Sequence, residues 1–369
     1  MALALPDFPW DSLVPFGERA RAHPDGIVDL SIGSPVDPTP DVIRAAMVAA
    51  ADAHSYPLTS GTPALREAIA AWFLRRRGVP GLRAANTLPT IGSKEFIAGL
   101  PLWLGLGRGD VVVYPRTAYP TYAIGAALVG ATAFPADDPA LWPVGTRLVW
   151  LNSPGNPDGR VLSTGELRAA VARARELGAV IVNDECYAEL AWDAPWAGAA
   201  TPSILDPRVI GDDRSGVLAV YSLSKQSNLA GYRAGFVAGG SSVIAELLAV
   251  RKHLGLVPPA PVQSAMIAAL TDDAHVAEQR ERYRARRSAL RSALESAGFR
   301  IDHSEAGLYL WATLGEQDWA TVARMADLGI LCAPGSYYGD DGSSHVRFAV
   351  TTTDERIAAA TARLAASSN

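Results

Sequence analysis

Lysine is scarce in this sequence of 369 residues. Only Lys94, Lys225 and Lys252 occur, whereas the other 30 of the 33 basic residues are arginine. Arginine cannot replace lysine where a neutral amine must attack a carbonyl, because its guanidinium stays protonated. The few lysines are therefore candidates for amine chemistry, although genomic base composition alone can also favour arginine.

Cysteine and histidine are sparse as well. Cys186 and Cys332 lie far apart in the sequence and form neither a disulfide framework nor a metal-spaced pair, which suits a reducing compartment. The six histidines are scattered without an HxH or HExxH pattern. We therefore expect no metal site.

Charge and hydropathy argue against further classes of protein. The net charge of −5 disfavours a nucleic-acid or anionic-membrane partner. No apolar run reaches the ~20 residues that span a bilayer. The N-terminal residues lack the basic and apolar regions of a signal peptide. We expect a cytoplasmic globular protein with no membrane and no nucleic-acid partner.

Two helices are marked by the residues at their ends. The segment 62–78 has Thr62 in position to cap a helix and Gly78 in position to end it. A second helix is predicted from Ser163, which stands in capping-box spacing with Glu166.

Short apolar segments alternate with such helices along the middle of the chain. Strands joined by helical crossovers indicate a mostly parallel α/β sheet flanked by helices. The predicted strands are 110–115, 147–152, 179–185, 216–224 and 234–240.

The sequence pattern changes at both ends of this region. Residues 1–40 are rich in proline, glycine and aspartate and predict an irregular arm. Residues 275–298 predict a long charged helix whose length suits a bridge between domains, and the remainder predicts a small α+β unit. The expected divisions are 1–38 for an arm and part of the small domain, 39–283 for a large domain, and 284–369 for a small C-terminal domain.

Polar side chains follow three of the predicted strands, where ligands bind in open parallel α/β sheets. Taken singly, each has an ordinary explanation: a turn former, a helix cap or a solvated lysine. Their shared edge of the sheet favours a common function. These residues are Asn156, Asp184, Tyr187, Ser222, Ser224 and Lys225.

Pyridoxal phosphate (PLP) explains this combination of side chains. Its aldehyde requires an amine such as Lys225, and its ring nitrogen requires a carboxylate partner such as Asp184. Its ring oxygen can accept hydrogen bonds from an amide and a phenol. Its phosphate requires hydroxyls, an arginine such as Arg233, and helix-terminal N–H groups such as those at Gly92 and Ser93.

The sequence also resembles the class I aminotransferases, which are PLP enzymes of fold type I. The resemblance implies a large domain with a mostly parallel sheet flanked by helices, and a smaller α+β domain. The matching motifs keep the family order from about residue 30 to residue 350. They are YPLTSGTPALREAIA (56–70), AYPTY (118–122), NSPGNPDG (152–159), NDECY (183–187) and SLSKQSNLAGYRAG (222–235).

This resemblance implies a role for each cofactor-binding residue. Lys225 is the expected Schiff-base lysine and proton shuttle, Asp184 the partner of the ring nitrogen, and Asn156 and Tyr187 the partners of the ring oxygen. Tyr119 is expected to stack on the ring. The expected phosphate ligands are Ser222, Ser224, Arg233, Gly92, Ser93 and Lys94.

The resemblance also implies substrate contacts and a subunit arrangement. Arg347 is expected to bind the substrate α-carboxylate, assisted by Asn156 and the Gly33 backbone. Without the family pattern, Arg347 would be taken for a surface residue on an edge strand. Tyr56 is expected to reach the phosphate of a neighbouring subunit, which implies a homodimer with shared active sites.

Within the family, the sequence is most similar to the succinyldiaminopimelate aminotransferases of lysine and diaminopimelate biosynthesis. The similarity rests on residues 5–13, 23–40, 203–209, 304–313 and 353–357. It implies amino transfer between N-succinyl-L,L-2,6-diaminopimelate and 2-oxoglutarate, with glutamate as co-product. Asp158 departs from the small hydroxyl residue common in the family, which affects only the expected shape of that loop.

Three alternatives remain open. A class I aminotransferase for aspartate, alanine or aromatic substrates has the same cofactor contacts, and so does a PLP-dependent C–S lyase. A non-enzymatic regulator built on this fold would be expected to carry a basic DNA-binding helix, a pattern that this sequence lacks.

Overall fold

A seven-stranded sheet lies at the centre of the computed structural model, which describes residues 5–198 and 200–367. Strand β8 runs antiparallel to its neighbours β2 and β7, whereas the other neighbouring strands are parallel. The predicted mostly parallel sheet is confirmed. In sheet order the strands are β2 Thr87–Ile91, β8 Ala234–Gly239, β7 Val217–Ser222, β6 Val180–Asp184, β5 Thr146–Asn152, β3 Val111–Tyr114 and β4 Thr132–Pro135.

The five predicted strands are present, and β2 and β4 are additional. Both additional strands lie at the edges of the sheet. Pro89 stands inside β2 and Pro135 ends β4. A proline lacks the N–H that a central strand needs, so these segments are strands only because an edge tolerates the loss.

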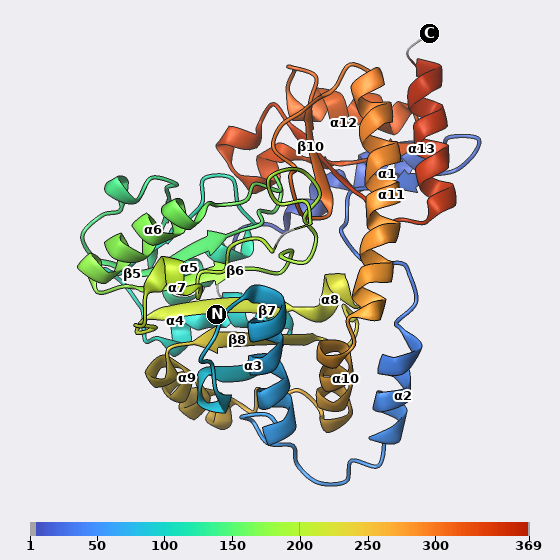
Figure 1. Ribbon diagram of the computed structural model, residues 1–369. Helices are drawn as coiled ribbons and strands as arrows, with labels where there is room; N and C mark the ends of the chain where they lie inside the picture. The colour runs from blue at the N-terminus through green and yellow to red at the C-terminus, as the bar shows by residue number, and fades with distance from the viewer. Residues whose placement is uncertain (1–4, 199, 368–369) are drawn as a thin grey trace.

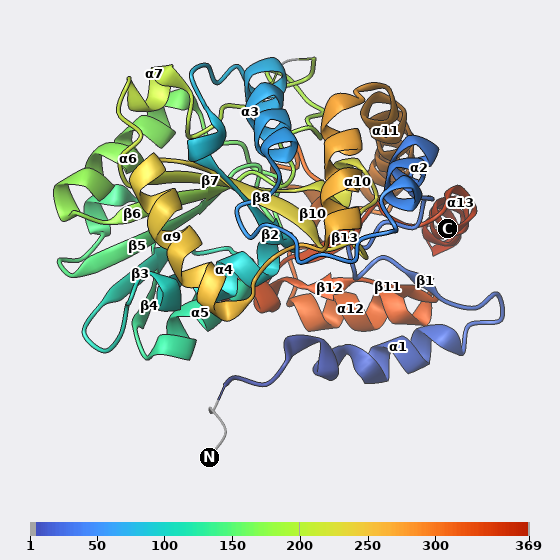
Figure 2. The same cartoon turned by 90° about the horizontal axis from the view of Figure 1, so that it is seen from below.

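Helices cover both faces of the sheet (Figure 2). Side chains of β5 alternate between the two faces: Val149 and Leu151 pack in one core, and Leu148 and Trp150 in the other. The first core contains residues from α2 Asp41–Ala49, α3 Pro63–Arg77, α6 Thr164–Leu177, α7 Pro207–Ile210 and α10 Ala260–Thr271. The second contains residues from α4 Gly92–Trp103, α5 Thr121–Val129 and α9 Ser241–Leu254.

Both helices predicted from their end residues are confirmed. The Thr62 hydroxyl accepts a hydrogen bond from the Leu65 N–H at 3.2 Å, and Gly78 ends α3 with φ of 65°. Ser163 and Glu166 form the predicted capping box at the start of α6. These caps satisfy N–H groups that the first turn of a helix leaves unpaired.

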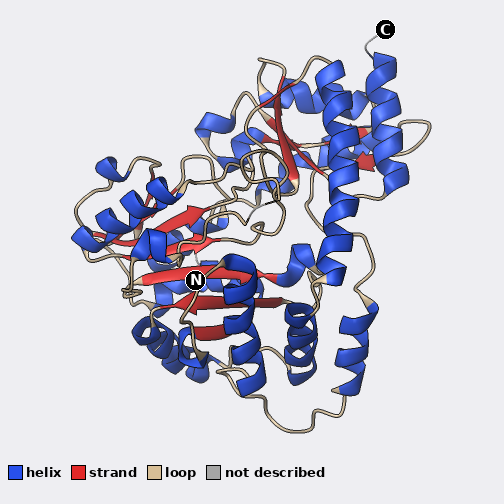
Figure 3. Ribbon diagram, in the orientation of Figure 1, coloured by secondary structure: helices blue, strands red, loops and turns tan. Residues whose placement is uncertain are grey.

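A second group of strands lies apart from the main sheet (Figure 3). It forms a four-stranded antiparallel sheet, with a short parallel pair beside it. The four strands are β12 Ala333–Pro334, β13 Val346–Ala349, β10 Tyr309–Thr313 and β9 Arg300–Ile301, and the pair is β1 Val28–Asp29 with β11 Ile330–Leu331. The predicted small α+β unit is confirmed, and its helices are α11 Ala274–Ser296, α12 Asp318–Asp327 and α13 Asp354–Ser367.

The predicted irregular arm contains regular structure, so that prediction was wrong in part. Helix α1, Val14–Arg21, and strand β1 belong to it. One face of α1 is buried, and the ring of Phe16 lies 5.3 Å from the ring of Trp319. Pro15 stands in the first turn, where its missing N–H costs no hydrogen bond, so packing against α12 outweighs the low helix propensity.

Helix α11 is the long helix that the sequence predicts at 275–298. Figure 1 shows it extending from the region of α8 Leu223–Gln226 to α13, and it contacts both elements. The predicted division at residue 284 therefore falls inside a continuous helix, and it stays a prediction. Short 3-10 helices complete the fold at Pro9–Leu13, Ala84–Asn86, Pro139–Leu141, Gly335–Tyr338 and Asp340–Gly342.

Candidate active site

A cavity of about 1050 Å³ opens at the carboxyl ends of β5, β6 and β7. Parallel pairing brings Asn152 of β5 opposite Asp184 of β6, so the segments that follow both strands start at one edge of the sheet. The cavity is lined by all six residues predicted from the strand ends, namely Asn156, Asp184, Tyr187, Ser222, Ser224 and Lys225.

Most of the other predicted site residues also line this cavity. They are Gly33, Ser93, Lys94, Tyr119, Arg233 and Arg347. Gly92 and Tyr56 are not among the lining residues of the described chain. Gly92 instead lies beneath Arg233, where a Cβ atom would be 2.4 Å from the arginine Nη2, and Tyr56 is fully exposed.

Lys225 is held at the cavity by a short turn of helix directly after β7. The Ser222 hydroxyl caps this turn by accepting a hydrogen bond from the Ser224 N–H at 3.2 Å. The Lys225 ammonium donates a hydrogen bond to the Gly33 carbonyl. The amine is thus only half-buried and faces the cavity next to a neutral acceptor.

Asp184 is a buried carboxyl that has only neutral hydrogen-bond donors. The Tyr122 hydroxyl donates to its Oδ2 at 3.0 Å, and the Cys186 N–H donates to its Oδ1 at 3.1 Å. Burial raises the pKa of Asp184 above its usual range, although these donors oppose the rise. The structure shows no ion pair to Asp184 within the described residues. A cation placed beside it from the cavity would restore its ionised form, which fits a protonated ring nitrogen.

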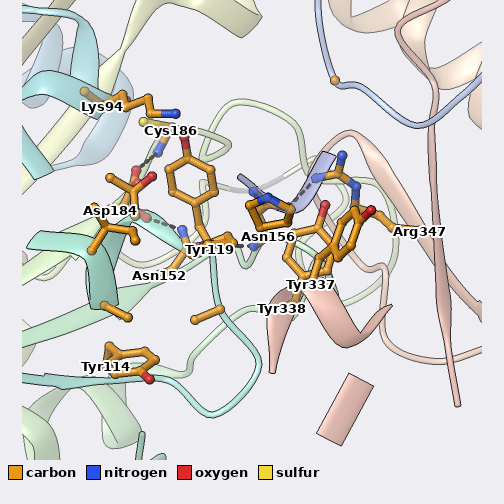
Figure 4. Close-up of a pocket in the computed structure, with 18 of the residues that line it drawn as sticks. Lys94, Tyr114, Tyr119, Asn152, Asn156, Asp184, Cys186, Tyr337, Tyr338 and Arg347 are labelled. Carbon is orange, nitrogen blue, oxygen red and sulfur yellow. Dashed lines mark hydrogen bonds between the residues drawn. The ribbon is translucent and has the colours of Figure 1, made fainter. Parts of the chain in front are cut away.

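Arg347 is buried at the opposite side of the cavity from Asp184, with Asn156 between them (Figure 4). Its Nη1 donates to Asn156 Oδ1 at 2.8 Å, and its Nη2 donates to the Ser31 carbonyl at 2.6 Å. Its Nε has no partner within residues 5–198 and 200–367. The interpretation of Arg347 as a surface residue on an edge strand is wrong, because β13 pairs on both sides and the side chain is 3% exposed.

Donors for an anion gather where α4 begins. Ser93 stands in the first turn of α4, and Ser222, Ser224 and Arg233 face the same cavity. The Ser222 hydroxyl also donates to the Ser224 hydroxyl at 2.8 Å. Helix N-termini, hydroxyls and guanidinium groups are the donors that phosphate prefers. Lys94 lies further out, with its ammonium 5.9 Å from the ring centroids of both Phe8 and Tyr119.

Several contacts in the cavity were not predicted from the sequence. Tyr122 stands in the AYPTY motif, but the motif does not indicate that its hydroxyl contacts Asp184. Asn152 accepts the Asn156 N–H at 2.8 Å and donates to the Asp184 carbonyl at 2.9 Å, which fixes the loop that carries Asn156. Tyr309 lies in a strand that the sequence marks only as apolar. Asp158 accepts the Arg160 N–H at 3.2 Å, and its loop still presents Asn156 to the cavity.

Residues 25–364 match the model of the family described as aminotransferase class I and II. The chain belongs to this family. The aminotransferases of class I use pyridoxal phosphate and act on amino acids and 2-oxo acids, so the cofactor inferred from the strand ends is confirmed. The side chains around Asp184, Lys225 and α4 fit that cofactor.

Similar proteins support the family over the whole length of this aminotransferase. It is 58% identical over 98% of its length to the 4-dedimethylamino-4-oxo-anhydrotetracycline transaminase OxyQ of Streptomyces rimosus, of which 99% is covered. A probable aminotransferase of Mycobacterium tuberculosis is 54% identical over 99% of this chain and 86% of its own length. The solved structure of N-succinyldiaminopimelate aminotransferase from Mycobacterium tuberculosis has a TM-score of 0.84 and 29% identity over 96% of both chains.

Two features are absent from the described residues. None of their helices is both long and apolar enough to cross a membrane. They also contain no group of three or more histidine, cysteine, aspartate or glutamate residues that could hold a metal ion.

Proposed function

We propose that this aminotransferase transfers the amino group between N-succinyl-L,L-2,6-diaminopimelate and 2-oxoglutarate. The observation that carries the proposal is the buried Arg347 guanidinium, which faces a cavity that also contains Lys225. A buried guanidinium whose side-chain and backbone partners are neutral suits a carboxylate ligand. The volume of about 1050 Å³ leaves room for an acyl chain beyond the amino-acid head.

The proposed roles divide the cavity into a cofactor side and a substrate side. Bound pyridoxal phosphate supplies an aldehyde that condenses with amines and a ring that accepts electron density. Lys225 would hold the cofactor through its side-chain amine and would take up and return the substrate Cα proton. Asp184 would hold the proton on the ring nitrogen, and Asn156 and Tyr187 would donate to the ring oxygen. Tyr119 would cover the ring, and the residues that would hold the phosphate are Gly92, Ser93, Lys94, Ser222, Ser224 and Arg233.

On the substrate side, Arg347 binds the α-carboxylate and thereby orients the Cα–H bond toward Lys225. The Gly33 carbonyl, which accepts a hydrogen bond from Lys225 in this structure, lies close enough to guide the same amine. Orientation of this kind converts binding energy into rate, because the reacting atoms are already aligned.

The subunit arrangement is part of the proposal. Tyr56 is fully exposed and lies outside the cavity lining of its own described chain, which supports a role at the phosphate of a neighbouring subunit. We propose a homodimer with shared active sites, located in the cytoplasm. The division into a large domain at 39–283 and a small domain at 284–369 is proposed on the same family pattern.

A second candidate is amino transfer to a polycyclic ketone. The 58% identity to a transaminase named for 4-dedimethylamino-4-oxo-anhydrotetracycline supports it. Aromatic side chains at the outer cavity also favour it, because Phe8, Trp10, Tyr337 and Tyr338 present flat apolar surfaces. The buried Arg347 favours an amino-acid substrate instead, because it can bind the α-carboxylate of such a substrate.

A half-reaction screen tests both candidates. The purified holoenzyme is mixed with single amino donors, and bleaching of the visible cofactor band is followed. Rapid bleaching by succinylated diaminopimelate and glutamate, with little response to alanine or tyrosine, is expected. The enzyme charged with glutamate is then offered either succinylated oxo acid or the polycyclic ketone. Return of the band with the ketone alone contradicts the first candidate, and release of pyruvate and ammonia without an oxo acid indicates a lyase.

A further inference from the structure

Two buried phenols meet inside the cavity. Tyr187 follows β6, Tyr309 begins β10, and their hydroxyl oxygens are 3.2 Å apart. The rings stand edge to face with centroids 5.7 Å apart. Both side chains are buried, which strengthens a hydrogen bond between them.

Tyr309 also adjoins the groups that would handle the substrate. The guanidinium carbon of Arg347 lies 3.9 Å from the centroid of its ring. A Cβ atom at Gly33 would stand 2.1 Å from the Tyr309 hydroxyl oxygen, so Gly33 is required for this close approach. The same Gly33 accepts the hydrogen bond from Lys225. The Tyr309 phenol therefore lies beside Tyr187, Arg347 and Gly33, whose carbonyl accepts the hydrogen bond from Lys225.

A proton count limits how the two phenols can work together. A phenol has one proton to donate. If Tyr187 donates it to Tyr309, none remains for the ring oxygen of the cofactor. Tyr187 can serve the ring oxygen only when Tyr309 is the donor within the pair.

The charges around the pair favour Tyr309 as that donor. Burial raises the pKa of Tyr309, but the positive charges of Arg347 and Lys225, together with the hydrogen bond with Tyr187, bring the pKa below its usual value. Burial raises the pKa of Tyr187 well above its usual value. The Arg347 guanidinium carbon lies 3.9 Å from the centroid of the Tyr309 ring, and a cation against a phenol ring strengthens its O–H as a hydrogen-bond donor.

We propose that Tyr309 is a positioning residue that donates its hydroxyl proton to Tyr187 and so keeps the Tyr187 proton available for the ring oxygen of the cofactor. This inference rests on the proposed role of Tyr187 and not on the identity of the amino-acid substrate. The Tyr309 ring has a separate task, because it stacks on the Arg347 guanidinium.

Tyr338 provides a matched control for the hydroxyl group. Its ring also lies under the Arg347 guanidinium, at 5.0 Å, and it lines the same cavity. Its hydroxyl has no hydrogen-bond partner in the described part of the chain. Tyr309→Phe and Tyr338→Phe therefore remove the same atom at two neighbouring sites, only one of which touches Tyr187.

The test is a pH titration of the visible band in the holoenzyme and in both variants. In Tyr309→Phe, Tyr187 keeps its own proton but loses the bond that strengthens it as a donor, so the midpoint is expected to rise by a measurable fraction of the roughly one pH unit that a whole hydrogen bond contributes. A weaker Tyr187 donor leaves the ring oxygen more basic, and that oxygen then holds the proton shared with the Lys225 nitrogen more tightly. In Tyr338→Phe the midpoint is expected to match the wild type. Equal midpoints in all three proteins, or equal rises in both variants, would overturn the proposal.

A double-mutant cycle tests whether Tyr309 acts through Tyr187. In the Tyr187→Phe background, Tyr309→Phe is expected to add no further rise in the midpoint. A full additional rise would overturn the proposal, because Tyr309 would then reach the cofactor by another route.

The KM for glutamate distinguishes the role of the Tyr309 ring from the role of its hydroxyl. This KM is expected to stay near the wild-type value in Tyr309→Phe and to increase in Tyr309→Leu.

These results are distinguishable from failure of the proposed function. The midpoint does not depend on which amino acid is the substrate, so a negative screen with succinylated diaminopimelate leaves this prediction in force. A wild-type protein without a visible band would overturn the roles of Lys225 and Tyr309 together. A normal band with an unmoved midpoint in Tyr309→Phe would overturn the present proposal alone.

Discussion

Two neighbouring acidic residues at the end of β6 have opposite environments. Glu185 is fully buried on one side, where it accepts hydrogen bonds from Arg77 at 3.2 Å, Ser203 at 2.9 Å and the Ile204 N–H at 2.8 Å. Asp184 faces the cavity on the other side and has neutral donors only. The first carboxylate is neutralised within the protein, whereas the second is neutralised only by a cation that enters the cavity.

Two of the buried arginines repeat this contrast. Arg77 is paired with Glu185, and both side chains are fully buried. Arg347 is 3% exposed and donates to an amide and a carbonyl, with no carboxylate against it in the described residues. An unpaired charge is costly to bury. A cavity with the unpaired Asp184 carboxyl on one side and the unpaired Arg347 guanidinium on the other therefore suits a cationic group beside the first and an anionic group beside the second.

The largest expected effect comes from Lys225, which lines the same cavity as Asp184 and Arg347. Lys225→Arg is expected to abolish turnover and the visible cofactor band, because guanidinium cannot condense with an aldehyde. The circular dichroism spectrum should stay that of the wild type. Lys252→Arg is the control, since Lys252 lies in α9 and does not line the cavity. Near-normal turnover in Lys225→Arg would contradict the assignment.

Asp184→Ala is expected to come next. Loss of the carboxylate removes the partner that keeps the ring nitrogen protonated, so kcat should fall by roughly 100-fold or more. The visible band should persist, because Lys225 is unchanged. Stopped-flow measurement of the half-reaction with glutamate separates the two effects, and an unchanged kcat would count against the proposed role.

Arg77→Met sharpens the contrast by breaking the internal pair. It leaves Glu185 as an uncompensated buried charge, and the free energy of unfolding should fall by about 3–5 kcal/mol. Arg347→Met leaves only neutral acceptors behind and should cost clearly less stability. Urea unfolding of the cofactor-free proteins measures both variants. Equal losses would show that the two arginines do not differ as proposed.

Arg347→Ala is expected to weaken substrate binding more than it slows chemistry. Loss of charge-assisted bonds to the α-carboxylate should lower kcat/KM for glutamate by the equivalent of about 2–5 kcal/mol. Arg356→Ala serves as the control, because Arg356 lies outside the active-site cavity. A KM for glutamate that does not change in Arg347→Ala would exclude the proposed contact.

The sequence predicts the cofactor side of the site better than the substrate side. Asp184, Tyr187 and Lys225 follow apolar strands, and parallel topology alone brings such residues to one edge. Arg347 reaches the cavity only because β13 pairs on both sides within the small sheet, an arrangement that the strand pattern does not specify. Tyr122 and Tyr309 were not predicted, because their hydroxyl contacts join residues 62 and 122 positions apart.

The helices and strands, too, were predicted only where the local sequence carries a signal for them. Central strands such as β6 and β7 are continuous apolar runs, and helices α3 and α6 carry capping residues at their ends, so local signals suffice. Edge strand β2 contains Pro89, and α1 contains Pro15 and Gly17, which locally favour turns. Packing across the molecule determines these elements, and no local signal predicts them.

The covalent attachment of the cofactor to Lys225 is tested most directly by peptide mapping after borohydride reduction of the holoenzyme. Reduction fixes the cofactor on the amine that carries it, and the chain offers only Lys94, Lys225 and Lys252 as side-chain amines. Mass spectrometry should find the added mass on the peptide that contains Lys225 and on neither of the other two. Labelling of Lys94 or Lys252 in its place, or a protein that acquires no label in excess pyridoxal phosphate, would contradict the assignment.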